Sequence, residues 1–114
     1  MDEFLIDLLE TFKYPVIRQG SMPPEQIYPD TFFTFWNNNH EEHSAYDNDT
    51  SNTIFDFDVN VYSCDTDKVF ELLESARTLL KQNGWIITRM GYDVASDEIT
   101  HIGKGMEVTF LQQL

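Results

Sequence analysis

The chain contains very little cysteine and no long apolar run. Cys64 is the single cysteine, so no disulfide bond can form within one chain, and a reducing compartment is the natural setting. No apolar stretch approaches the ~20 residues of a membrane-spanning helix, and the N-terminal Met1-Asp2-Glu3 has no basic residue of the kind that begins a signal peptide. We therefore expect a cytoplasmic protein, or part of an assembly built in the cytoplasm, without membrane contact.

Basic residues are also scarce. The 114 residues include 7 Lys and Arg against 20 Asp and Glu, which gives a formal net charge of −13. Affinity for nucleic acid comes mostly from Lys and Arg that neutralise phosphates, and anionic membranes attract the same side chains. The charge therefore argues against specific binding to DNA, RNA or lipid. It favours solubility, or a channel wall that DNA passes without sticking.

The length predicts one domain spanning residues 1–114. Hydrophobic residues make up 41% of the chain and aromatic residues 14%, which is enough for one core and argues against disorder. Because aromatic residues are enriched at interface cores, part of this surplus could form an oligomer surface.

The stretch from Ile54 to Gly84 predicts one strand followed directly by one helix. Apolar and polar residues alternate from Phe55 to Val61, which is typical of a half-buried strand. Asp65 can cap the helix, whose apolar residues then fall on one stripe, and Asn83-Gly84 supplies a left-handed stop. The strand and the helix can bury their apolar surfaces against each other.

The other segments complete an α+β domain with the order α-β-β-β-α-β-β. We expect a mainly antiparallel sheet with two helices packed on one face. Residues 37–53 are strongly polar and predict a long hairpin loop projecting from the body, while residues 91–105 predict a polar, turn-rich connection. The remaining predicted elements are one helix and four strands, over residues 2–13, 16–18, 31–36, 85–89 and 106–111.

Two segments of the polar loop could suggest a metal site. His40 and His43 in His-Glu-Glu-His are three residues apart, whereas zinc proteases place two histidines four apart on a helix. Residues 47–51 begin like a calcium loop, but Asn52 stands where the sixth position needs glycine. A solvated polar loop explains both segments better, so we predict neither a metal nor a cofactor.

No catalytic set is predicted, and we do not expect an enzyme. Cys64 lies at a strand–helix junction, where a thiol pKa can fall, but the three histidines all lie in other loops, which favours a structural role. Asp56 and Asp58 share one strand face and could form an acid–base pair, although the wet side of a half-buried strand is simpler. Gly103-Lys104-Gly105 is too short for a phosphate loop, and a turn explains it.

Five segments together resemble a family of small structural proteins from tailed bacteriophages and prophages of Gram-positive hosts. In element order, the members of this family are similar to the tail-terminator and tail-to-head joining, or tail completion, proteins of long-tailed phages. The segments are YPVIRQG (14–20), YPDTFFTFWN (28–37), FDFDVNVYS (55–63), the helix that ends in NGW (83–85), and GYDVASDE (91–98).

The resemblance implies a non-catalytic virion protein that assembles in the host cytoplasm. Subunits of this kind form a ring, six-fold in such proteins, that caps the tail-tube protein, offers a surface to the head connector and lets DNA pass through its centre. Long polar loops reach neighbouring subunits. A ring needs two different patches on each subunit, and the candidate interface residues are Phe32, Trp36, His40, His43, Tyr46, Asp49 and Tyr62.

Two other functions stay open at this point. The first is a protein-binding module of phage or bacterial origin that uses the 37–53 loop to recognise its partner. The second is a small enzyme or metal site built on His40, His43 and nearby aspartates.

Overall fold

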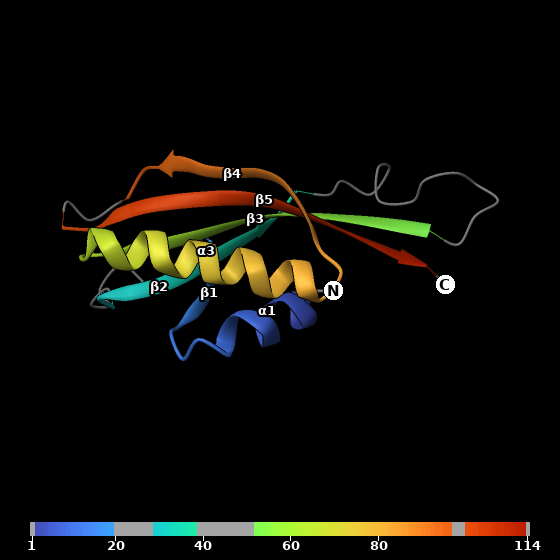
Figure 1. Cartoon of the computed structure of the whole chain (residues 1–114), viewed down its shortest axis with the longest axis horizontal. Helices are drawn as coiled ribbons and strands as arrows, with labels where there is room; N and C mark the ends of the chain where they lie inside the picture. Colours follow the sequence, from blue (N-terminus) through green and yellow to red (C-terminus); the bar gives the residue numbers. More distant parts are fainter. Residues whose placement is uncertain (1, 20–28, 39–51, 97–99, 114) are drawn as a thin grey trace.

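A computed structural model describes residues 2–19, 29–38, 52–96 and 100–113. In these residues a five-stranded, mostly antiparallel sheet with the order β1-β2-β3-β5-β4 carries two helices on one face (Figure 1). This arrangement confirms the predicted fold class and element order. The elements are α1 (Asp2–Glu10), β1 (Val16–Arg18), β2 (Thr31–Asn37), β3 (Asn52–Ser63), α3 (Thr66–Gln82), β4 (Ile86–Val94) and β5 (Ile102–Gln113).

The predicted strand–helix unit, β3 followed by α3, forms the centre of the core. Asp65 caps α3 by accepting a hydrogen bond from the backbone N–H of Asp67 at 3.0 Å, and Gly84 has a φ of 93° just beyond the helix. The apolar stripe of α3 packs against the side chains of β3 that point toward it. The buried members of the two elements are Val69, Leu72, Leu73, Ala76 and Leu80 on α3, and Phe57, Val59 and Val61 on β3.

Helix α1 docks beside α3 and buries Leu5 and Leu9 completely. It ends at Glu10, three residues before the predicted end, because Lys13 takes a left-handed φ of 69° and Pro15 follows. Neither this helix nor any other in the described part of the chain is long and apolar enough to cross a membrane.

The second half of the chain differs from the sequence prediction. Residues 91–105 were expected to be a connection, but β4 continues to Val94 and β5 begins at Ile102. Gly103 and Gly105 therefore lie within a strand and not in a turn. A Cβ on Gly103 would lie 2.7 Å from the Tyr62 ring, so glycine lets aromatic side chains of neighbouring strands cross the sheet.

Strands β3 and β5 pair with each other over a longer stretch than β3 pairs with β2 or β5 pairs with β4. Their pairing runs from Ser63↔Ile102 to Asn52↔Gln113, whereas β2 pairs with β3 only as far as Phe57 and β4 pairs with β5 only as far as Thr109. Among the described residues, 52–55 and 110–113 pair with each other alone and thus form a two-stranded ribbon that projects from the sheet (Figure 1). The predicted 37–53 loop is shorter at both ends than expected, and residues 39–51 lie outside the described residues.

Candidate functional site

The candidate site lies on the face of the sheet opposite α1 and α3, which we term the open face. Side chains alternate between the two faces of a strand, and cross-strand partners share a face. The register therefore assigns residues to the open face from four adjacent strands. They are Phe32, Thr34 and Trp36 on β2, Ile54, Asp56, Asp58, Asn60 and Tyr62 on β3, Gly103, Gly105, Glu107, Thr109 and Leu111 on β5, and Ile86, Arg89, Tyr92 and Val94 on β4.

One half of the open face is aromatic and buried. The rings of Phe32 and Tyr62 stack with centroids 5.2 Å apart, and the imidazole of His101 lies 6.0 Å from the ring of Phe32. Phe32 is 3% exposed and Tyr62 is 9% exposed. These two predicted interface residues therefore pack within their own chain, and their contribution to a subunit contact stays a prediction.

The other half of the open face holds a polar hollow of about 400 Å³, which we term the acidic hollow. Its three carboxylates each accept a hydrogen bond from a hydroxyl group. Thr109 donates to Asp56 at 2.5 Å, the Tyr92 phenol donates to Asp58 at 3.3 Å, and Thr88 donates to Glu107 at 3.1 Å. The residues that line the hollow are Asn38, Asp56, Asp58, Thr88, Arg89, Tyr92, Glu107 and Thr109.

Tyr92 is held in its neutral form at this site. Partial burial, followed by the charge and hydrogen bond of Asp58, raises the pKa of the Tyr92 phenol from 10.0 to about 12. The guanidinium of Arg89 lies 4.6 Å from the centroid of the Tyr92 ring. The phenol therefore acts as a hydrogen-bond donor near neutral pH, and it is a poor base or nucleophile.

Exposed apolar side chains surround the acidic hollow. Trp36 is the cross-strand partner of Asp58, Ile86 is the partner of Thr109, and Leu111 follows Thr109 by two residues on the same face. These three side chains are 47%, 57% and 44% exposed, respectively, and we term them the apolar rim. Trp36 is thus the one predicted interface residue in the described part of the chain that is exposed.

Several predicted site residues cannot be placed. His40, His43, Tyr46, Asp49 and the calcium-like segment 47–51 all lie outside the described residues. Within the described ranges, no group of three or more His, Cys, Asp or Glu side chains could hold a metal ion.

The structure brings Cys64 and His101 together, although the sequence predicted that they lie apart. His101 had been placed in a different loop from Cys64, but its Nε2 lies 3.6 Å from the Cys64 Sγ. The same Nε2 lies 2.8 Å from the Pro29 carbonyl oxygen, which can only accept, so Nε2 carries the proton. Because the thiol faces an N–H and not a lone pair, this geometry does not make His101 a base for Cys64. Only the register Ser63↔Ile102, which is not visible in the sequence, would have revealed the pair.

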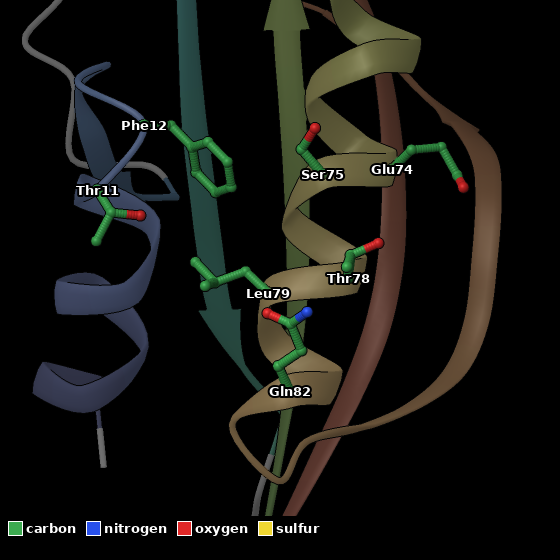
Figure 2. A pocket seen from close by; sticks show the side chains of 7 residues that line it. All are labelled: Thr11, Phe12, Glu74, Ser75, Thr78, Leu79 and Gln82. Atoms are coloured by element: carbon green, nitrogen blue, oxygen red, sulfur yellow. The ribbon is translucent and has the colours of Figure 1, made fainter.

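A second concavity, of about 450 Å³, lies between α1 and α3 (Figure 2). Phe12 lies near one end of it, and short polar side chains of α3 line the opposite wall. Glu74 is the one carboxylate of the lining, and it lies 3.4 Å from the guanidinium of Arg77. The packing of the two helices therefore explains this concavity better than a binding site for a charged ligand does.

A scan of the sequence against models of protein families gives no match, and a search of curated proteins finds no similar sequence.

Proposed function

We propose that this protein is a structural subunit of a tailed bacteriophage or prophage. Its copies form a ring that caps the tail tube and joins the tube to the head. The five segments that resemble tail terminator and tail completion proteins motivate this function. The structural observation that supports it best is the two-stranded ribbon formed by residues 52–55 and 110–113.

The ribbon is suited to contact with a neighbouring subunit. In the described part of the chain no third strand pairs with the ribbon, and two strands alone are only marginally stable in water. The ribbon would therefore gain stability by packing against another surface. One side of it carries Phe55 and Phe110, which pack against the core, and the other side carries Leu111, which is 44% exposed. A neighbouring copy that covers Leu111 would complete this second side.

The acidic hollow on the open face is a second, chemically different surface, which borders the ribbon at Leu111. A ring needs such a pair of unlike patches, because each subunit contacts its two neighbours, or a neighbour and the tube, through different surfaces. The net charge of −13 fits the same role. It keeps free subunits apart and gives a central channel that DNA passes without binding.

The test is assembly on tail tubes. The purified chain is mixed with tubes of the tail-tube protein from the same genome, and the tube ends are imaged by electron microscopy. We expect a ring of added density at one end, and a Leu111→Asp variant that fails to form it. Phe70→Asp is the matched control, because Phe70 is a similarly exposed apolar residue on α3. Bare tube ends with the unaltered chain would contradict the proposal.

The open face also favours a second function, a non-catalytic module that binds one protein partner. The exposed apolar residues beside the acidic hollow are of the kind that marks an interaction site on a protein surface. Affinity capture with the full chain separates the two functions. A single cellular partner without any virion component would favour the binding module over the ring.

A further inference from the structure

We propose that the open face is a docking surface for a segment of a different protein, which inserts an arginine or lysine side chain into the acidic hollow. Apolar residues of the same segment cover Trp36 and Ile86 of the apolar rim, while Leu111 stays available to the neighbouring copy proposed above. This inference goes beyond the ring assembly proposed above, and it holds whether or not the chain belongs to a phage tail.

The charge of the acidic hollow favours a cationic partner. Asp58 and Glu107 line the hollow together with Arg89, whose guanidinium stacks on the ring of Tyr92. Within the described part of the chain, Asp58 and Glu107 have hydroxyl donors as partners and lie in no ion pair. Half-buried carboxylates that are paired with neutral donors attract a cation.

The apolar rim favours a protein over a free ion as the occupant of the open face. Large apolar side chains that gather at one site on a surface mark interaction sites. Trp36, Ile86 and Leu111 lie on the same face as the hollow, on three different strands. Tyrosine, tryptophan and arginine dominate the centres of protein interfaces, and the open face already supplies the first two. A segment with a basic residue between apolar ones is complementary to both parts.

A second copy of this chain is a poor source of the cation. All seven Lys and Arg lie in described residues, and most have partners within the chain. Arg18, Arg77 and Lys104 form ion pairs with Asp2, Glu74 and Asp93, while Lys68 and Arg89 lie over aromatic rings. This leaves Lys13 and Lys81, on a chain whose copies repel one another at a net charge of −13. The occupant is therefore a foreign basic segment.

The test is a titration of the full chain followed by two-dimensional NMR of its backbone amides. The probe is the peptide acetyl-Ser-Val-Arg-Val-Ser-amide, and the same peptide with glutamine in place of arginine is the neutral control. We expect saturable shifts at the amides of β3, β4 and β5 around the hollow with the arginine peptide only. Raising the salt from ~0.1 M to ~1 M, which shortens the Debye length from ~10 Å to ~3 Å, should weaken the binding.

Charge-removing variants locate the binding site. Asp58→Asn and Glu107→Gln keep the shape of each side chain, and each should weaken binding about threefold, or about tenfold together. Glu71→Gln is the control, because it removes the same charge from an exposed position on α3 and should leave the affinity unchanged. If the double variant does not fold, Trp36→Thr replaces it and should weaken the binding through the apolar rim.

Four results would overturn the inference. The first is the absence of saturable shifts with the arginine peptide, and the second is a set of shifts spread over the whole surface. The third is an affinity that Asp58→Asn, Glu107→Gln and Trp36→Thr leave unchanged. The fourth is a concentration-dependent shift of the amides around the acidic hollow without any peptide, which would identify a second copy as the occupant.

Discussion

The phenol of Tyr92 donates a hydrogen bond of 3.3 Å to the carboxylate of Asp58, although the two residues lie on strands that do not pair. Strand β5 runs between them, and Gly105 is the cross-strand partner of Tyr92. A Cβ on Gly105 would lie 2.7 Å from the Tyr92 ring, so the absence of a side chain there lets the ring cross toward β3. Gly105 thus allows the hydrogen bond that joins Tyr92 of β4 to Asp58 of β3 in the acidic hollow.

The first prediction concerns the titration of Tyr92. Its pKa of about 12 means that the folded chain keeps this proton after the unfolded chain has lost it at about pH 10. The folded state then binds more protons, so the free energy of unfolding should fall as the pH rises from about 10 to about 12. Ultraviolet absorbance should show a tyrosine that ionises late, at about pH 12. Tyr92→Phe should remove that late phase, and a late phase that persists in this variant would contradict the assignment.

The second prediction concerns the close approach at Gly105. Gly105→Ala places a Cβ against the Asn60 Oδ1 and 2.7 Å from the Tyr92 ring, which forces both to shift. We expect a loss of about 1–3 kcal/mol in the free energy of unfolding, measured by urea denaturation. The comparison is Gly91→Ala, where the new Cβ meets open space and only the φ of 80° costs about 1–2 kcal/mol. Only Gly105→Ala should also change the titration of Tyr92.

The third prediction concerns the start of α3. Asp65→Ala removes the side-chain acceptor for the N–H of Asp67 and should cost about 1 kcal/mol in the free energy of unfolding. Glu71→Ala, at an exposed position within the same helix, should change it by less than about 0.5 kcal/mol. Equal urea midpoints for the two variants would show that the cap contributes nothing.

The fourth prediction separates stability from assembly. Leu80 is completely buried, so Leu80→Ala should lower the free energy of unfolding by about 2–5 kcal/mol. Leu111 is 44% exposed on the ribbon, so Leu111→Ala should change it by less than about 0.5 kcal/mol. If Leu111→Ala destabilised the isolated chain as much as Leu80→Ala, the ribbon would already be packed before assembly.

The sequence predicts the parts of the fold that depend on local signals. The alternation around Phe57, the cap at Asp65 and the stop at Gly84 all act within a few residues, and the structure confirms each of them. The shared face of Asp56 and Asp58 was also visible, because it needs only the two-residue period of a strand.

The sequence did not predict features that depend on contacts across the sheet. Gly103 and Gly105 resemble turn residues until the rings of Tyr62 and Tyr92 are placed over them. The hollow joins Asp58 to Glu107, which lie far apart along the chain but opposite each other in the register. The same holds for Cys64 and His101, which meet because the ends of two paired strands coincide.

Strand β3 pairs with β5 over a longer stretch than it pairs with β2. The backbone hydrogen bonds in its two parts should therefore open with different free energies. Amides at 57–63 are held between β2 and β5 and should exchange with deuterium only when the whole chain unfolds. Amides at 52–55 have β5 alone as a partner strand in the described residues and should exchange through local fraying. A neighbour that covers the ribbon would slow this local exchange, so deuterium exchange at residues 52–55 would report whether another protein has docked there.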